Sequence, residues 1–278
     1  MALASDLLAR AGYEVKVYIT ERKGHGIELA GEALREGASL IIAGGGDGTY
    51  NECMNALAGT QIPMGILPMG TTNVLAKELG IPENVQGAVK RLLDSKPREV
   101  YPGRLRFESG PAFQDEISER RFFLMAGVGF DADAVYRVNK KLKLYSGKTA
   151  YIWSGIKHLM DWQPDPIAVN VDGRDFSASS LIVCKGARYG GHIKAAPHAK
   201  ITEPWLHALI MHGRKKIHPV KYAAGMLTGT LVKFRDVDYV KCKSVRVGGI
   251  RHVQADGDYI GKSPVTIDIS PETVKLLF

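Results

Sequence analysis

A chain of 278 residues can bury one large core or two smaller ones, and two domains are the better expectation. Its composition, 45% hydrophobic and 24% charged, is ordinary for a globular protein, and no apolar run is long enough to span a bilayer. The three cysteines lie far apart, which favours buried thiols in a reducing cytoplasm over a disulfide framework. The first residues lack a basic leader followed by an apolar block, so we expect no signal peptide.

The formal net charge of +8 has two interpretations. The surface is simply rich in lysine, or it attracts a polyanion such as acidic membrane lipid. The clearest basic cluster, interleaved with apolar residues as in an interfacial helix, consists of Arg137, Lys140, Lys141, Lys143 and Lys148. A solvated helix face would explain this cluster equally well. We expect no nucleic-acid partner, because no aromatic–basic motif appears, and a homodimer is compatible with the sequence.

The first hundred residues alternate between helix and strand patterns. Helices are expected over 1–11, 27–35, 74–79 and 84–93, with a further helix that includes 53–57, and strands over 13–20, 39–43 and 64–68. This alternation predicts a parallel, three-layer α/β domain. The three strands end at Thr20, in the glycine run 44–48 and in 68–73, so their carboxyl ends are expected to meet at one ligand-binding edge.

The glycine run is the most informative feature of this edge. It joins a short apolar strand to a helix, and this arrangement points backbone N–H groups and a helix N-terminus at a phosphate. The glycines let the backbone approach a ligand closely. Asp47 lies within the run, where its carboxylate is suited to hold a metal ion or to handle a proton. The run therefore predicts a site for nucleotide phosphates.

After residue 98 the pattern changes. Strands are expected over 100–107 and 121–129, a helix over 131–158, and short alternating strands from residue 167 onward. Asp172-Gly173 between two alternating runs predicts a hairpin. We therefore expect a nucleotide-binding domain over residues 1–98 and a β-rich domain over 99–278. A cleft between them would be the natural place for a reaction.

Several segments resemble, in order, the motifs of the diacylglycerol kinase catalytic family, which also includes sphingosine and ceramide kinases. GGDGTYNE at 45–52 is similar to the family's GGDGT-x-NE, LPMGTTN at 67–73 to its LPxGTxN, and AGVGFDA at 126–132 to its GxGFDA. YGG at 189–191 resembles its YGGG segment, and QADGD at 254–258 resembles its DGE. The resemblance extends from about residue 13 to the end of the chain.

The resemblance implies an α/β fold, with an N-terminal phosphofructokinase-like three-layer domain and a C-terminal β-sandwich domain. It also implies ATP-dependent transfer of the γ-phosphoryl group to the hydroxyl of a membrane lipid such as diacylglycerol, with Mg²⁺ as cofactor. Such an enzyme would be cytoplasmic and peripheral at the inner face of the membrane, with a lipid substrate and anionic lipid as partners.

Functional residues follow from the matching positions. The nucleotide-binding positions are Thr20, Gly45, Gly46, Asp47, Gly48, Thr49, Tyr50, Asn51 and Thr71. Asp47 would orient Mg²⁺, and Asn73 would contact the nucleotide or cap the following helix. Asp258 stands where the family has a glutamate that acts as general base, so its side chain is one methylene shorter. TEPW at 202–205 replaces the family's metal-linked DDGL, which leaves Glu203 as the candidate metal ligand.

One departure concerns the beginning of the chain. Family members usually begin with a strand and an NPxSG loop that touches ATP, whereas this chain starts at the helix that would follow. We expect a start that lies upstream, in preference to an active short form. Two other functions stay open: an NAD-kinase-like enzyme with a soluble acceptor, and a non-catalytic protein that binds nucleotide or lipid.

Overall fold

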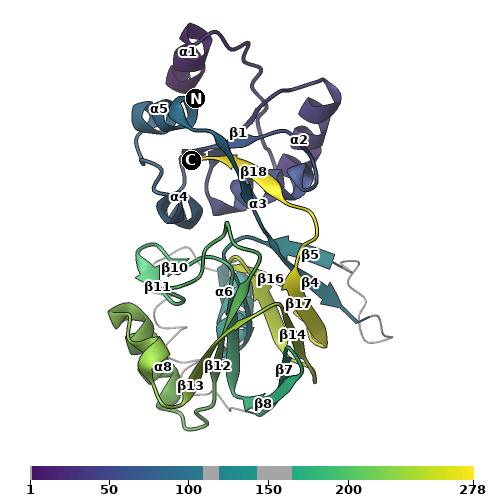
Figure 1. The fold of residues 1–278 in the computed structure, drawn as a ribbon, viewed down its shortest axis with the longest axis vertical. Coiled ribbons are helices and arrows are strands. Elements are labelled where there is room, and N and C mark those ends of the chain that lie inside the picture. The colour runs from purple at the N-terminus through teal and green to yellow at the C-terminus, as the bar shows by residue number, and fades with distance from the viewer. Residues whose placement is uncertain (1, 109–118, 143–164) are drawn as a thin grey trace. The chain divides into compact units, whose positions relative to one another are not determined.

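The computed structural model describes residues 2–108, 119–142 and 165–278, with the side chains of 137–142 left out (Figure 1). The chain divides into two compact units. Unit 1 comprises Met1–Pro102, Gly190–His192 and Ser270–Phe278, and unit 2 comprises Gly103–Tyr189 and Ile193–Ile269. The expected boundary after residue 98 differs from this division, because the last nine residues belong to unit 1.

Unit 1 is built on a four-stranded sheet with the order β1-β2-β18-β3. β1 (Ile41–Gly45), β2 (Met64–Pro68) and β18 (Val274–Leu277) run parallel, whereas β3 (Pro97–Val100) is antiparallel to β18. The sheet is therefore mixed rather than purely parallel. All five residues of β2 are buried, as expected for a strand with a neighbour on each side and helices packed against it.

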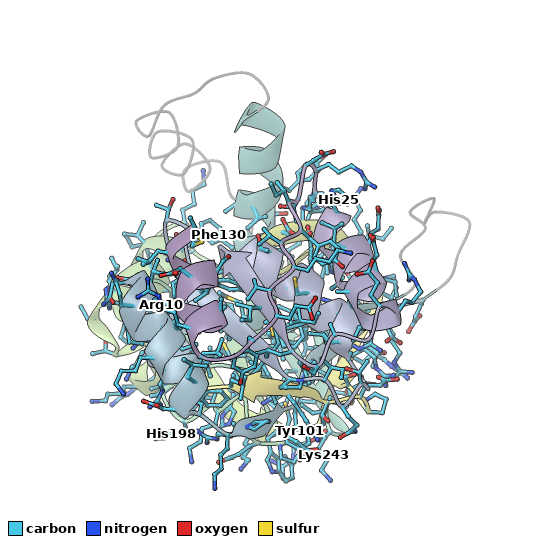
Figure 2. The ribbon with its side chains drawn as sticks, turned by 90° about the horizontal axis from the view of Figure 1, so that it is seen from above. Arg10, His25, Tyr101, Phe130, His198 and Lys243 are labelled. Atoms are coloured by element: carbon cyan, nitrogen blue, oxygen red, sulfur yellow. The ribbon has the colours of Figure 1, made fainter. Side chains whose placement is uncertain are left out.

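The helices of unit 1 are α1 (Ala2–Arg10), α2 (His25–Arg35), α3 (Asp47–Leu57), α4 (Val74–Glu78) and α5 (Val85–Asp94). Each of the helices expected within the first hundred residues forms. Arg10, at the C-terminal end of α1 and labelled in Figure 2, pairs with Asp6 one turn earlier. Asn84 caps α5 by accepting a hydrogen bond from the Gly87 N–H at 2.7 Å.

The strand expected over residues 13–20 is wrong. These described residues lie between α1 and α2 without joining a sheet, and Tyr13, Val15, Val17 and Ile19 are exposed. Lys16 Nζ, 2.6 Å from a Glu36 carboxylate oxygen, holds the segment against the end of α2. A strand needs a neighbour for its backbone groups, and within the described residues β1 pairs only with β2.

Unit 2 contains two six-stranded antiparallel sheets. The first has the order β13-β12-β9-β6-β15-β16, and the second has the order β5-β4-β17-β14-β7-β8. The first consists of β13 (Val237–Cys242), β12 (Leu206–Met211), β9 (Ser180–Cys184), β6 (Met125–Gly129), β15 (His252–Ala255) and β16 (Asp258–Lys262). The second consists of β5 (Glu119–Phe122), β4 (Gly103–Phe107), β17 (Val265–Ile269), β14 (Ser244–Val247), β7 (Ile167–Val171) and β8 (Arg174–Ala178). A short hairpin joins β10 (Arg188–Gly190) to β11 (Ile193–Lys194).

The hydrophobic core of unit 2 lies between these sheets, as expected for a β-sandwich. Leu181 and Val183 of β9 point into this core, and so do Val245 and Ile267 of the second sheet. The hairpin expected at Asp172-Gly173 is present, with both residues at positive φ as its turn type requires.

The first sheet is covered on its outer face as well. Ile182, Leu209 and Met211 point away from the sandwich core and pack with Tyr222 of α8 (His218–Thr228) and Leu231 of the short helix η1 (Leu231–Lys233). This second cover explains why β9 and β12 are buried at every position and lack the alternation typical of a half-exposed strand. A further helix of this unit, α6 (Phe130–Leu142), contacts β6, β9 and β15.

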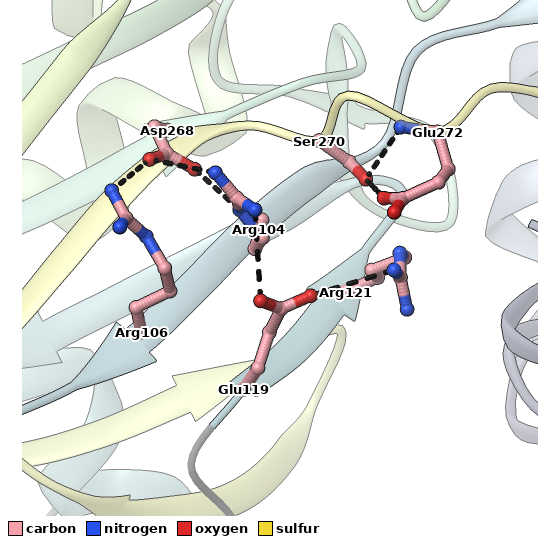
Figure 3. A network of polar contacts seen from close by, with 7 residues as sticks. All are labelled: Arg104, Arg106, Glu119, Arg121, Asp268, Ser270 and Glu272. Carbon is pink, nitrogen blue, oxygen red and sulfur yellow. Dashed lines mark hydrogen bonds and ion pairs between the residues drawn. The ribbon is translucent and has the colours of Figure 1, made fainter.

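The outer face of the second sheet is polar (Figure 3). Arg104 of β4 makes a bidentate contact with Asp268 of β17, with its Nε 2.8 Å from Oδ1. Arg106 reaches the same carboxylate at 2.5 Å, and Glu119 of β5 links Arg104 to Arg121. The sheet therefore follows the usual pattern of an antiparallel sheet, with apolar residues inward and charged pairs outward.

No helix within the described ranges is long and apolar enough to cross a membrane. The three cysteines all lie in the described part of the chain as buried thiols, as the sequence predicts, and none of them forms a disulfide. Burial raises the pKa of the Cys53 thiol to about 11, so this group stays protonated.

Candidate functional site

The predicted strand–glycine–helix arrangement is present in unit 1. β1 ends at Gly45, Gly46 occupies the N-cap position of α3 in an extended conformation, and α3 begins at Asp47. A Cβ built on Gly45 would lie 2.5 Å from the Thr49 hydroxyl oxygen. The tight turn into the helix thus requires a residue without a side chain at this position.

The N-terminus of α3 is available to an anion. The first N–H groups of a helix have no acceptor inside it, and no side chain of the described residues caps Asp47, Gly48 or Thr49. Gly48 is exposed, and a Cβ there would meet nothing within 4 Å. The positive end of the helix dipole adds to the attraction. These features together fit the terminal phosphates of a nucleotide.

The carbonyl of Gly45 connects this turn to the loop after β2. It accepts hydrogen bonds from the backbone N–H groups of Met69, at 2.8 Å, and of Gly70, at 2.9 Å, and from the hydroxyl of Tyr50. A Cβ on Gly70 would lie 2.6 Å from the Gly46 Cα, so the two glycine segments touch through their backbones. The GGDGT and LPMGTTN segments therefore form one structural unit.

Asp47 does not point freely into this turn. Its Oδ2 accepts a hydrogen bond from the Val74 N–H at 3.0 Å and its Oδ1 one from the Leu75 N–H at 2.9 Å. Asp47 therefore caps the N-terminus of α4. Asn73, expected to cap α4 or to contact the nucleotide, makes no cap bond: its amide exchanges hydrogen bonds with the backbone of Gly70. The capping role predicted for Asn73 belongs to Asp47.

Glu52, at the other end of the GGDGTYNE segment, likewise caps the N-terminus of a neighbouring helix. Its two carboxylate oxygens accept hydrogen bonds from the N–H groups of Gly24, at 2.7 Å, and Gly26, at 2.9 Å. The receiving helix is α2, whose first residue His25 is labelled in Figure 2. Helix α3 thus carries two carboxylates that fix the N-termini of two neighbouring helices.

The other nucleotide-binding candidates of unit 1 occupy different environments. Tyr50 is fully buried, and its burial raises the pKa of its hydroxyl. Asn51 is buried and accepts a hydrogen bond from the Asn55 amide at 2.9 Å. Thr20 and Thr71 are exposed. The structure therefore gives Tyr50 and Asn51 structural contacts, and a nucleotide role for all four residues stays a prediction.

In unit 2, the candidate base Asp258 is the first residue of β16 and is half-buried. The neighbouring Asp256 accepts hydrogen bonds from the backbone N–H groups of Phe123, Leu124 and Met125, at 2.8 to 3.0 Å. Asp256 therefore fixes the β15–β16 turn against the start of β6. The catalytic role of Asp258 is a prediction that these contacts leave open.

Asp131, at the start of α6, is a buried carboxyl group to which the sequence analysis gave no role. It accepts a hydrogen bond from the Gln254 amide at 2.6 Å and another from the Tyr189 hydroxyl. Burial raises its pKa, and these two hydrogen bonds partly oppose the effect. Its motif, AGVGFDA, was the signal that could have drawn attention to it.

Asp131 borders an apolar pocket on the outer face of the first sheet. The pocket has a volume of about 80 Å³ and lies between α6 and α8. Phe130 and Ala134 line it from α6, and Tyr222, Ala223 and Met226 line it from α8. An apolar pocket with one buried acid at its wall is suited to an apolar ligand that carries a single polar group.

The candidate metal ligand Glu203 contacts two lysines. Its carboxylate lies 3.0 Å from Lys200 Nζ and 3.5 Å from Lys241 Nζ, and the Lys200 contact lowers its pKa. Lys185, fully buried, donates hydrogen bonds to the carbonyls of Lys200 and Glu203. The described residues contain no cluster of three or more acidic, histidine or cysteine side chains that could hold a metal ion. A metal role for Glu203 stays a prediction.

An α/β unit with a turn suited to bind phosphate, together with an antiparallel β-sandwich unit, makes this a two-domain protein with a candidate nucleotide site. Residues 1–105 match the model of the diacylglycerol kinase catalytic domain. Residues 125–278 match that of the YegS C-terminal NAD kinase beta sandwich-like domain. The chain belongs to the diacylglycerol kinase catalytic-domain family, a family of lipid kinases that use ATP. The family resemblance and the fold class predicted from the sequence are confirmed.

Individual relatives agree with this assignment. The chain is 29% identical over 263 residues to a diacylglycerol kinase of Staphylococcus haemolyticus, which covers 92% of this chain and 76% of the relative. It is also 29% identical to a diacylglycerol kinase of Bacillus subtilis, over 92% of this chain and 82% of the relative. A crystal structure of a diacylglycerol kinase from Bacillus anthracis has the same fold, with a TM-score of 0.72 over 98% of this chain and 88% of that one, at 24% identity.

Proposed function

We propose that this protein transfers the γ-phosphoryl group of ATP to the hydroxyl of a membrane lipid such as diacylglycerol. Membership of the lipid kinase family supports the reaction class. The observation that carries the proposal is the open N-terminus of α3, where the N–H groups of Asp47, Gly48 and Thr49 face no protein cap within the described residues. Such a terminus favours a phosphate over a neutral ligand.

In the proposed reaction, the lipid hydroxyl oxygen attacks the γ-phosphorus while the bond from that phosphorus to the β–γ bridging oxygen breaks. ADP is the leaving group, and Asp258 accepts the hydroxyl proton. Catalysis of this kind depends on positioning and on neutralisation of charge, which the backbone N–H groups of the turn supply. Mg²⁺ bound with ATP would neutralise phosphate charge. Asp47 would orient this ion through the acceptor lone pairs that remain beside its hydrogen bonds from the Val74 and Leu75 N–H groups.

The lining of the apolar pocket favours an apolar group, such as part of a lipid chain, over a charged one. Its walls are mostly aliphatic and aromatic, and the one carboxyl group among the lining residues named above is Asp131, whose raised pKa favours a neutral form. A soluble, highly charged acceptor such as NAD would find few polar partners among these residues. Its lipid substrate would bring the enzyme to the inner face of the cytoplasmic membrane.

The test is transfer of labelled phosphate from ATP to a panel of lipids and to NAD. We expect labelling of a lipid alcohol, loss of labelling without Mg²⁺, and strongly reduced turnover in Asp258→Asn with unchanged ATP affinity. Exclusive labelling of NAD would replace the acceptor class. Binding of Mg-ATP without transfer to any acceptor would leave a non-catalytic binding protein, a function that the structural contacts of Asp47 also permit.

A further inference from the structure

Helix α8 of unit 2 has an unusual distribution of apolar side chains. Four large apolar side chains are exposed in the described part of unit 2, and three of them lie at or on this helix: Ile217 (62% exposed), Val220 (46%) and Leu227 (71%). With Ala224, also exposed, they follow a spacing of three and four residues, so they share one face of the helix. We call these four residues the outer stripe of α8.

The opposite face of α8 is apolar as well. Tyr222 and Met226 pack onto the outer face of the first sheet, and both line the pocket beside Asp131. A helix at the surface of a globular protein normally presents polar residues to water on the side away from its core. An apolar outer face on such a helix indicates a second apolar environment.

The segment of the chain that contains the outer stripe is rich in basic residues. The segment 212–238 contains six lysines and arginines, at 214, 215, 216, 221, 233 and 235, but only two acidic residues. Both acids are already engaged, Asp236 by Lys221 and Tyr222 and Asp238 by His212. Lys215 and Lys216 are exposed at the start of the helix, and no ion pair to either side chain is found among the described residues.

From this arrangement we infer that α8 is a membrane-docking helix that lies in the surface of a bilayer containing anionic lipid. Apolar side chains on one stripe, bordered by lysine and arginine, are the signature of a helix that inserts at the headgroup level and is held there by acidic lipid. Figure 1 shows α8 at the periphery of unit 2, where such contact requires no rearrangement of the sheet beneath it.

The pocket favours a lipid surface over a protein partner. The same helix that carries the outer stripe forms one wall of the apolar pocket with its inner face. A bilayer that receives the outer stripe would therefore bring hydrocarbon chains close to this pocket. The inference extends the proposed function, because it names the surface by which a lipid kinase would reach a substrate that stays in the membrane.

The test is flotation of the full chain, without ATP, with neutral phosphatidylcholine vesicles and with vesicles containing one fifth phosphatidylglycerol. We expect the wild type to float with the anionic vesicles. Ile217→Ser/Val220→Ser/Leu227→Ser should bind at least about tenfold more weakly. Lys215→Gln/Lys216→Gln should lose about 30-fold on anionic vesicles and nothing on neutral ones.

Matched controls come from elsewhere in unit 2. Ile250→Ser removes another exposed apolar side chain, and Arg246→Gln/Lys262→Gln removes two exposed charges outside the segment. Both controls should float like the wild type. All variants change exposed residues, so their thermal unfolding midpoints should be unchanged; should the triple variant unfold, the lysine pair still decides the result.

Three outcomes would overturn the inference: absence of wild-type flotation, equal flotation of the wild type and both α8 variants, or a wild-type dimer in solution that the triple variant abolishes without any vesicle binding. Kinase activity on a short-chain diacylglycerol in neutral micelles separates this inference from the proposed function. Activity without flotation refutes the docking helix alone, and flotation without activity refutes the kinase assignment alone.

Discussion

Asp47 is the residue whose structural contacts most change its interpretation. A carboxylate in a glycine turn suggests a catalytic role, but both oxygens of Asp47 accept hydrogen bonds from backbone N–H groups at the start of α4. In Asp47→Asn an NH₂ group replaces one of these oxygens, so that two hydrogen-bond donors face each other where the wild type has a donor and an acceptor. We expect a loss of about 1–3 kcal/mol in the free energy of unfolding, measured by urea denaturation, together with loss of phosphoryl transfer.

The matched control is Asp94→Asn, which changes an exposed carboxylate that pairs with Lys90 on the surface of α5. Its stability should stay within about 0.5 kcal/mol of the wild type, because exposed ion pairs contribute little. An Asp47→Asn protein as stable as the control would show that the cap of α4 contributes nothing measurable. Loss of activity would then point to chemistry alone.

His207 makes a prediction about pH. Burial beneath Tyr239, together with the nearby charge of Lys241, lowers its pKa to about 4, from an ordinary value near 6.5. Between these two pKa values the unfolded chain binds a proton at His207 that the folded chain does not bind. The contribution of His207 to the free energy of unfolding is therefore fully present above pH 6.5 and decreases as the pH drops toward 4. His207→Phe should lose roughly 2 kcal/mol less than the wild type between pH 7 and pH 4.5, as measured by urea unfolding. Identical pH profiles would contradict the burial of a neutral imidazole.

At the scale of elements, the sequence was sufficient to predict those turns and strands that depend on contacts between neighbouring residues. The Asp172-Gly173 hairpin could be predicted because its turn requires positive φ at two positions, and Asp-Gly is a pair that adopts it. The glycine turn before α3 could be predicted because only glycine fits at position 45, where a side chain would clash with Thr49. Alternation also located β14, β15 and β17. These patterns are written into neighbouring residues and need no knowledge of the tertiary fold.

Elements that depend on distant partners were harder to predict. Residues 13–20 alternate as a strand does, but no neighbour pairs with them in the described structure, and their apolar side chains stay exposed. β18, by contrast, is a short apolar run at the C-terminus that gives no sign of its place between β2 and β3. Register and pairing across 170 residues or more are not encoded in a local pattern. The helix expected over 131–158 is described only as far as Leu142, and the side chains of its whole basic cluster lie outside the described residues.

The candidate site also has one part that the sequence predicts and one part that it does not. Its backbone component, the free N–H groups of α3, follows from sequence because glycine spacing determines it. Its side-chain contacts do not: nothing local links Asp47 to α4, Glu52 to α2 or Asp131 to Gln254, which is 123 residues away. Motif matching marks positions for a nucleotide role that stays a prediction, while the structure shows that Asp47 and Glu52 hold the N-termini of neighbouring helices.

At the scale of the whole molecule, the chain leaves unit 1 after Pro102 and, apart from Gly190–His192, returns to it only at Ser270. The two crossing points are tied by a hydrogen bond from the Ser270 N–H to the Pro102 carbonyl, at 2.9 Å. The returning segment supplies β18, which separates β2 from β3 in the sheet. The candidate anion-binding turn thus follows a strand of a sheet whose third strand is supplied by residues 274–277.

This dependence makes Leu276, which is fully buried in β18, a test of how the turn is supported. Leu276→Ala leaves a cavity in the sheet of unit 1 and should cost about 2–5 kcal/mol. We expect hydrogen exchange to accelerate in peptides from β1 and β2 and to stay unchanged in peptides from β9 and β12 of the sandwich. The control is Lys275→Ala, which changes the adjacent residue, whose side chain contacts Gln61 on the surface. In this variant the hydrogen exchange of β1 and β2 should be as slow as in the wild type. If Leu276→Ala leaves the exchange of β2 unchanged, then the C-terminal strand does not support the sheet that carries the turn.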